Sequence, residues 1–327
     1  MRSFFKYKII VVIALLWGVF SMAQREPQYT QYIHNIGSFN PAYSVSVEHT
    51  DISALYRAQW IDIPGAPTTI RLGANFPLAN DKTGLGFNVV SDQLGPSSQT
   101  YVDIAYSYQI NLSEETWLSF GLDAGGSFLN VNFSEGVFQN PLEPAIGGDN
   151  FNQFYPTIGG GLFMYGESWY TGISTPNFLA LGIYDEELET VIDDNLQLDF
   201  IAGYVFDISD GTKFKPAALV NYVDRGPVTI NLSANFLFLD AFTLGASYRF
   251  DNAVSGVAGF QISNSIYLGY SYDYNTNGLA QFTNGSHEAI LKFSLGREGN
   301  QPNKGGKKKP NNKFKGKLKQ VDSPRFF

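Results

Sequence analysis

The 327-residue sequence contains no cysteine, and only 16% of its residues are charged. Without cysteine, the chain has no disulfide, thiolate metal site, cysteine nucleophile or lipid-modified N-terminal cysteine. The low charge, together with 33 glycines, 19 tyrosines and 27 phenylalanines, favours a β protein. After residue 23 no apolar run resembles a transmembrane helix. The length suits one large domain or two ordinary ones.

The N-terminus has the pattern of an export signal. Three positive charges in MRSFFKYK precede the apolar run IIVVIALLWGVF, and the small residues of SMA precede Gln24. This order is typical of a cleaved signal peptide. A retained membrane anchor is the alternative, but the run is shorter than the ~20 residues that span a bilayer. We therefore expect residues 1–23 to be removed.

Alternation of apolar and polar residues dominates the rest of the chain. From Val102 to Ile110 the even-numbered residues are apolar or aromatic, whereas the odd-numbered ones are Asp, Ala, Ser and Gln. LQLDFIAGYVFDI and SIYLGYSYDYN repeat the pattern, which indicates β-strands with two different faces. The sequence predicts fourteen strands, near residues 50–58, 67–76, 83–91, 99–110, 116–129, 155–165, 168–174, 196–207, 213–222, 227–237, 241–250, 253–262, 265–274 and 286–296.

Loop lengths distinguish a barrel from a soluble sandwich. If the N-terminus is periplasmic, strands that run outward are followed by long connections such as TPNFLALGIYDEELETVIDDN, and returning strands by turns such as YGES and SNS. Long outer loops, short periplasmic turns and an even strand number are typical of outer-membrane barrels. We therefore predict an all-β, transmembrane, antiparallel up-and-down β-barrel of about fourteen strands in the outer membrane, with both termini periplasmic.

Charge divides the chain further. Residues 24–296 carry a net charge of −19, whereas residues 297–327 carry +8. We expect a signal peptide (1–23), a periplasmic N-terminal lead-in (24–49), an outer-membrane β-barrel (50–296) and a disordered basic periplasmic tail (297–327). The tail either contacts an anionic periplasmic partner or is a solvated extension without one; the export signal argues against nucleic acid. Its candidate contact residues are Lys307, Lys308, Lys309, Lys313, Lys315 and Lys317.

The segments YTQYIHNIGSFNPAY and ALYRAQWIDIPGAPTT, followed by TGLGFNVVSDQLGP and a closing SHEAILKFSLG, resemble the PorP/SprF family of outer-membrane proteins of type IX secretion and gliding motility. The resemblance implies a non-enzymatic barrel that works with other secretion components and exports or anchors a secreted surface protein such as an adhesin. Its partner would then be that protein or its C-terminal domain. The motif residues include Gln28, Tyr29, Gln31, Tyr32, Asn40, Pro41, Ala42, Tyr43, Tyr56, Arg57, Gln59, Trp60, Gly65, Ala66 and Pro67.

These motifs also have a physical interpretation. Pro41 disfavours helix at Asn40 and makes FNPAY a turn into the first strand, from which Phe39 and Tyr43 tuck under the barrel wall. Trp60 is interpreted as an anchor at the membrane interface. Arg57 is either a lumen-facing charge paired with an acid or a partner contact.

The long outer loops supply the candidate partner-binding residues Phe138, Phe151, Phe154, Asp185, Glu186, Glu187, Asp193 and Asp194. The acidic loop lacks the glycine-turned spacing of a Ca²⁺ loop, so we interpret it as a solvated loop that selects a partner by charge. No metal or cofactor is expected, and outer-membrane lipid is expected around the barrel.

Two other function classes remain. A channel for a small solute or lipid would use lumen-facing acids, for which Asp103, Asp199, Asp207 and Asp273 are candidates. A lipid hydrolase would need Ser286 and the adjacent His287 to act together. Neighbouring strand residues point to opposite faces, so we predict no catalysis.

Overall fold

The computed structural model describes residues 27–79, 82–132, 150–179, 196–224 and 226–295, and the backbone of 182–183 and 192–193. In these residues no helix is long and apolar enough to span a membrane. Four short 3₁₀ helices are η1 (Tyr32–His34), η2 (Ile36–Ser38), η3 (Pro41–Val45) and η6 (Gly278–Gln281). The strands are β1 (Thr50–Ala58), β2 (Thr68–Pro77), β3 (Thr83–Leu94), β4 (Ser97–Ser113), β5 (Thr116–Val131), β6 (Phe151–Tyr165), β7 (Trp169–Thr175), β8 (Gly182–Ile183), β9 (Ile192–Asp193), β10 (Gln197–Tyr204), β11 (Phe206–Ser209), β12 (Thr212–Val223), β13 (Thr229–Phe238), β14 (Phe242–Arg249), β15 (Ala253–Ser263), β16 (Ile266–Asn275) and β17 (Ser286–Leu295).

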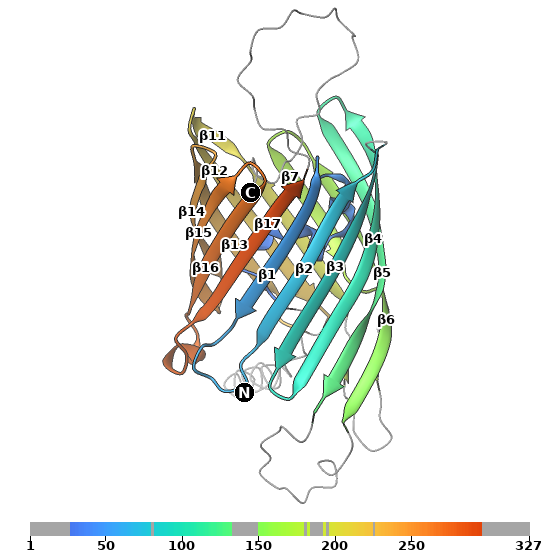
Figure 1. Ribbon diagram of the computed structural model, residues 1–327, viewed down its shortest axis with the longest axis vertical. Coiled ribbons are helices and arrows are strands. Elements are labelled where there is room, and N and C mark those ends of the chain that lie inside the picture. Colours follow the sequence, from blue (N-terminus) through green and yellow to red (C-terminus); the bar gives the residue numbers. More distant parts are fainter. Residues whose placement is uncertain are drawn as a thin grey trace, which may run out of the picture.

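The strands form a closed antiparallel barrel, in which β1 pairs with β17 (Figure 1). β10 and β11 hold the same register against β12, so they act as one strand interrupted at Val205. That register places Tyr204 opposite Pro216, which has no amide hydrogen to donate. Counted this way, the described wall has fourteen strands, which confirms the sequence prediction; β8 and β9 form a separate two-stranded sheet.

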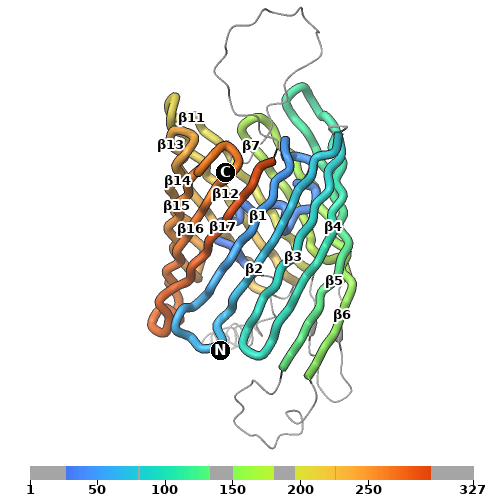
Figure 2. Tube along the Cα trace, in the orientation of Figure 1, coloured from blue at the N-terminus to red at the C-terminus, as the bar shows by residue number. Residues whose placement is uncertain are grey.

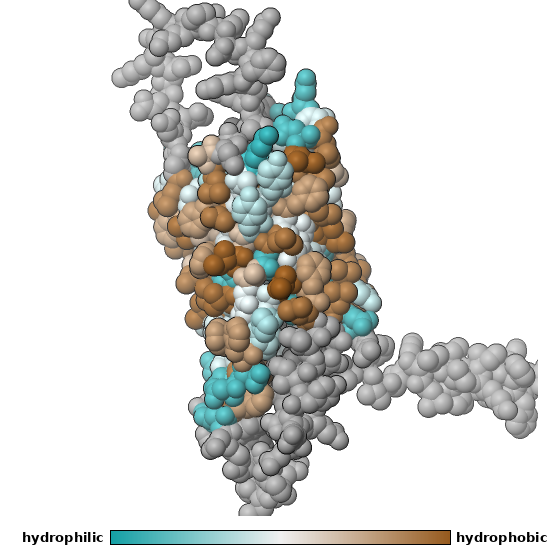
Figure 3. All heavy atoms as spheres, turned by 90° about the vertical axis from the view of Figure 1, so that its right-hand side faces the viewer, coloured by the Kyte–Doolittle hydropathy of each residue, from teal (hydrophilic) through white to brown (hydrophobic). Residues whose placement is uncertain are grey.

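The predicted alternation is confirmed along the wall. In β4 the even-numbered residues from Ile104 to Ile110 are exposed on the outside, whereas Ala105, Ser107 and Gln109 are buried on the inside. Figure 3 shows the side formed by β4–β6, where hydrophobic side chains cover most of the middle and hydrophilic ones gather toward the ends. An apolar outer surface whose backbone groups are paired between strands is what a bilayer requires.

The two ends of the barrel differ in the length of their connections. One end, which we call the turn end, has short connections such as residues 114–115 and 264–265. The other, the loop end, has the connections 132–150 and 176–196. The connections therefore have the asymmetry that the sequence predicted.

Residues 27–49, which we call the luminal segment, lie inside the barrel. The segment starts at the loop end, where the Gln28 side chain bonds Thr229, and reaches the turn end, where Ser44 bonds Asn75. Figure 2 shows this blue segment crossing the interior behind β1–β3. The sequence predicted a periplasmic lead-in here. The structure differs because the polar groups of the segment find their partners on the inward faces of the strands.

The described chain begins at the loop end and finishes with Leu295 at the turn end. The sequence predicted that both termini lie in the periplasm, at one end of the barrel. Residues 1–26 and 296–327 lie outside the described residues, and with them the expected signal peptide and basic tail. The position of the termini therefore stays a prediction.

Candidate functional site

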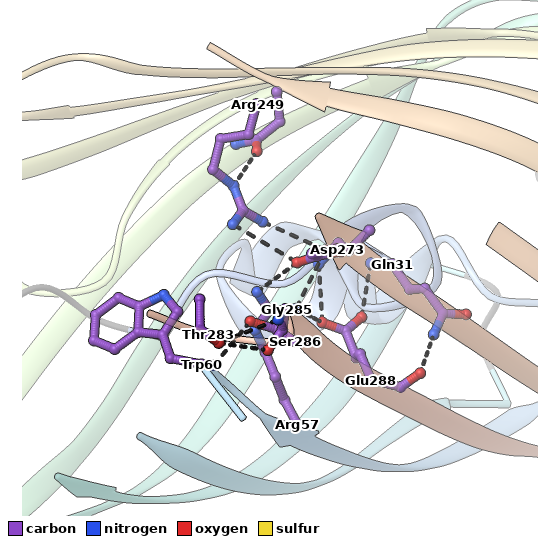
Figure 4. A network of polar contacts seen from close by, with 11 residues as sticks. Gln31, Arg57, Trp60, Arg249, Asp273, Thr283, Gly285, Ser286 and Glu288 are labelled. Atoms are coloured by element: carbon purple, nitrogen blue, oxygen red, sulfur yellow. Dashed lines mark hydrogen bonds and ion pairs between the residues drawn. The ribbon is translucent and has the colours of Figure 1, made fainter. Parts of the chain in front are cut away.

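A buried network of charged side chains surrounds the start of the luminal segment (Figure 4). Arg57 on β1 lies between Asp273 on β16 and Glu288 on β17. Its Nη2 is 2.7 Å from Asp273 Oδ2, and its Nη1 is 2.8 Å from Glu288 Oε2. All three residues are at most 2% exposed. Of the two roles that the sequence left open for Arg57, the structure shows a lumen-facing charge paired with acids.

The same carboxylates bind the backbone of the luminal segment. Glu288 accepts hydrogen bonds from the amides of Thr30 (2.9 Å) and Gln31 (2.8 Å). The Thr30 hydroxyl donates to Asp273 Oδ1 at 2.7 Å. Hydrogen bonds to ionised acceptors are stronger than neutral ones, so two wall strands hold this end of the segment firmly.

Arg249 on β14 completes the network. Its Nη1 lies 4.0 Å from Asp273 Oδ2, and its Nε donates to Asn231 Oδ1 at 2.7 Å. Two arginines thus face two carboxylates, and the group carries no formal net charge. Buried charges are tolerated when they are compensated and hydrogen-bonded in this way.

A second anchor lies farther along the lumen. The Asn88 side chain on β3 donates to the carbonyl of Gly37 and to Asp103 Oδ1, both at 3.0 Å. It accepts from Arg71, whose Nη1 donates to Ser53 at 3.0 Å. The wall therefore contacts η2 as well as the start of the luminal segment.

The Asn40-Pro41-Ala42 motif docks on β5 and β6. Asn40 caps η3 by accepting from the amide of Ala42 at 3.0 Å, and its Nδ2 donates to the carbonyl of Leu162 at 3.1 Å. Ser119 donates to the carbonyl of Ala42 at 2.6 Å. Pro41 occupies the first position of η3, where its missing amide hydrogen costs nothing. The expected turn is therefore a capped 3₁₀ helix inside the lumen.

Inward-facing glycines make room for this motif. A Cβ atom at Gly121 would lie 2.1 Å from the Ala42 nitrogen, and one at Gly161 would lie 2.3 Å from Asn40 Oδ1. We call Gly121 and Gly161 the glycine cradle. Sequence reasoning missed it, although glycine within a strand is a known sign of a close backbone approach.

We expect Asn40→Ala to lower the free energy of unfolding by about 0.5–2 kcal/mol, because the variant loses a helix cap and a bond to the wall. Asn35→Ala is the matched control, since Asn35 is also buried in the segment but neither of its side-chain polar atoms has a hydrogen-bond partner among the described residues. Thermal unfolding in detergent, followed by circular dichroism, measures both. Equal losses would contradict the assigned role of Asn40.

Other motif residues have local partners. Tyr32 OH lies 2.9 Å from Ser233 Oγ, and the ring of Tyr43 packs edge-on against Phe163 with 5.6 Å between centroids. In the β1–β2 connection, the Gln59 amide donates to the carbonyl of Pro67 at 2.9 Å.

In the same connection Gly65 has a φ of +73°. This is a conformation that suits glycine. The Trp60 amide donates to Ser286 Oγ at 3.1 Å. The predicted interfacial role of the Trp60 side chain stays a prediction.

The predicted partner-binding residues are only partly described. Phe151 and Phe154 lie in β6, where the outward Phe154 ring is 4.8 Å from that of Phe128. The Asp193 backbone pairs with Gly182. Phe138, Asp185, Glu186, Glu187, Asp194 and the six tail lysines lie outside the described residues.

Ser286 and His287 point to opposite faces of β17. Ser286 is buried on the inside, whereas His287 Nδ1 lies 2.5 Å from the hydroxyl of the outward Tyr270. They are not arranged as a nucleophile and its base. Among the described residues no group of three His, Asp or Glu side chains is placed to hold a metal ion.

A cavity of about 80 Å³ lies between the luminal segment and the wall and is lined in part by Asp103, Asp123 and Asp199. Asp273 belongs to the network around Arg57, and Asp207 is exposed. The cavity is large enough for water molecules.

A closed barrel with an apolar outer wall and a polar interior is an outer-membrane β-barrel, here with its own N-terminal segment in the lumen. Over residues 21–293 the chain matches the family described as type IX secretion system membrane protein PorP/SprF. The chain belongs to this family, which confirms the resemblance seen in its sequence motifs.

Similarity to solved structures concerns the fold alone. The CymD monoaromatic hydrocarbon channel has a TM-score of 0.49 and 14% identity, over 81% of this chain and 92% of that one. The Ralstonia pickettii toluene transporter TbuX has a TM-score of 0.47 and 9% identity, over 78% and 91%. The KdgM porin has a TM-score of 0.35 and 9% identity, over 75% and 99%. No curated protein matches the chain.

Proposed function

We propose that this protein is a sealed outer-membrane platform that binds a secreted surface protein, such as an adhesin or its C-terminal domain, during type IX secretion. The observation that carries the proposal is the luminal segment. Charged and polar groups of the wall hold it at both Thr30 and Ala42, so the chain itself occupies part of the lumen. An occupied lumen suits a binding protein better than a solute channel, and the loops then provide the binding surface.

The loop end is proposed to face the outside and the turn end the periplasm. The asymmetry of the connections supports this orientation. Under it, β17 delivers the basic tail to the periplasm, where Lys307 and its neighbouring lysines would meet an anionic partner. In this orientation Pro27, at the start of the luminal segment, would lie at the outer end of the lumen.

The acidic loop is proposed to select the secreted partner by charge. Asp185, Glu186, Glu187, Asp193 and Asp194 all belong to the connection 176–196 at the loop end. A partner with a basic surface would be attracted to this connection.

Neutralising these five acids to Asn and Gln is expected to reduce the amount of co-purified secreted protein several-fold, because long-range attraction and rim contacts are lost. The measurement is a pull-down of tagged full-length protein from detergent-solubilised outer membrane, with quantitative mass spectrometry. The matched control neutralises Asp207, Asp210 and Asp240, which are acids at the turn end.

Equal recovery from all variants would refute a role for the acidic loop. Recovery of the barrel alone, together with a solute-dependent conductance of the wild-type protein in planar bilayers, would instead support the channel alternative.

A further inference from the structure

A groove of about 570 Å³ lies on the outer wall where β4–β7 and β10 come together, on the side that Figure 3 shows. Its volume falls within the roughly 300–1,000 Å³ of typical ligand sites. Aromatic and branched aliphatic side chains line most of it, among them Phe120, Leu122, Leu162, Ile173 and Phe178. We call it the lateral groove.

Gly160 is one of the lining residues, and it lets the Phe178 ring lie close against the wall. A Cβ atom there would lie 2.9 Å from the ring of Phe178 and 3.3 Å from Leu122 Cδ2. Phe178 and Leu122 are 54% and 64% exposed, so both side chains point outward, cover Gly160 and form one border of the groove. Gly160 therefore faces the outer side of the wall, unlike the inward-facing glycine cradle.

The path of the chain deepens the groove. Pairing between β6 and β7 stops at Gly160 and Thr175. The next backbone–backbone hydrogen bond between these segments is donated by the Phe178 amide to the carbonyl of Ile158 at 2.7 Å. Between Thr175 and Phe178 the chain leaves the ladder, and the Phe178 ring becomes one side of the groove.

An occupant of this groove must be apolar, because the outward faces of membrane-spanning strands meet hydrocarbon. Thirteen residues line it, whereas a stable protein interface uses about 20–30 residues a side. A single chain-like molecule fits this surface better than a second protein. We propose that the lateral groove binds one acyl chain of a bilayer phospholipid.

The shape of the lateral groove is the reason why an acyl chain would bind there rather than elsewhere on the wall. Lipid tails are as apolar as the side chains they touch, so contact with hydrocarbon alone does not favour one part of the wall over another. A chain in a groove contacts more protein atoms than a chain on a flat wall, and many small dispersion contacts add up. A bound chain should therefore persist when the rest of the annular lipid has been removed.

The test uses the delipidated full-length protein in detergent with near-equimolar phosphatidylcholine that carries a diazirine on one acyl chain. After illumination, mass spectrometry locates the labelled peptides. We expect peptides of β5–β7 to be labelled several-fold more than those of β13–β15. Equal labelling around the barrel would overturn the proposal, as would dimerisation through this face that excludes the lipid.

A pair of variants separates the groove from the wall in general. Ile173→Trp places a large side chain in the groove, and Leu244→Trp places one on β14; both wild-type residues are 45% exposed. Labelling of β5–β7 should fall several-fold only in Ile173→Trp. Unchanged labelling of a folded Ile173→Trp, judged by its β-sheet circular dichroism, would refute the assignment.

Discussion

Arg57→Met is expected to lower the free energy of unfolding by about 3–5 kcal/mol, because it leaves the buried carboxylates of Asp273 and Glu288 without their nearest cation. Urea unfolding in lipid vesicles, followed by tryptophan fluorescence, gives the change. Lys213→Met is the control: its ion pair with Asp240 spans 3.1 Å and the Asp240 side chain is 71% exposed, so we expect a loss below about 1 kcal/mol.

A triple variant shows whether the loss comes from uncompensated charge. Arg57→Met combined with Asp273→Asn and Glu288→Gln removes all three charges and should recover a large part of the lost stability. If Arg57→Met alone is as stable as the wild type, this network does not hold the luminal segment.

Gly121→Val is expected to open the barrel. Its new Cβ atom would lie 2.1 Å from the backbone nitrogen of Ala42, and backbone cannot move aside as the tip of a side chain can. The Asn40-Pro41-Ala42 motif must therefore leave its position on β5 and β6. Single-channel recording in planar bilayers should show a steady conductance that the wild type lacks, and a protease should cut the luminal segment.

Gly256→Val is the matched control for this variant. A Cβ atom at Gly256, in β15, meets nothing within 4 Å, so the same substitution should leave the conductance unchanged. A folded Gly121→Val barrel that remains closed would show that another part of the segment seals the lumen.

The strands were predictable because each has one face toward lipid and one toward the lumen, so apolar and polar residues alternate along its sequence. The path of the luminal segment could not be predicted in this way. Its three 3₁₀ turns have no regular period, and it buries polar residues such as Asn35 and Asn40 beside apolar ones such as Tyr32 and Ile36. Its motifs identified the family but not their place in the barrel.

The partners of Arg57 could not be predicted either, because they lie far from it in the sequence. Asp273 lies 216 residues away and Glu288 lies 231 residues away. Only the register of β16 with β17 and of β17 with β1 brings the three together. Pairing with an acid in the lumen was one of the two roles that the sequence left open for Arg57. The sequence did not identify the acid, nor did it show that the backbone of Thr30 shares it.

The pairing of β1 with β17 also has a consequence for assembly. Glu288 lies on the last strand, and it binds a segment that precedes the first. These contacts and the pairing of β1 with β17 both join the start of the barrel sequence to its end. Both therefore form only when the longest loop in the barrel sequence is closed. The segment therefore need not be threaded through a finished ring. The wall can close around the segment. When β17 then pairs with β1, Glu288 finds the amides of Thr30 and Gln31 already in place.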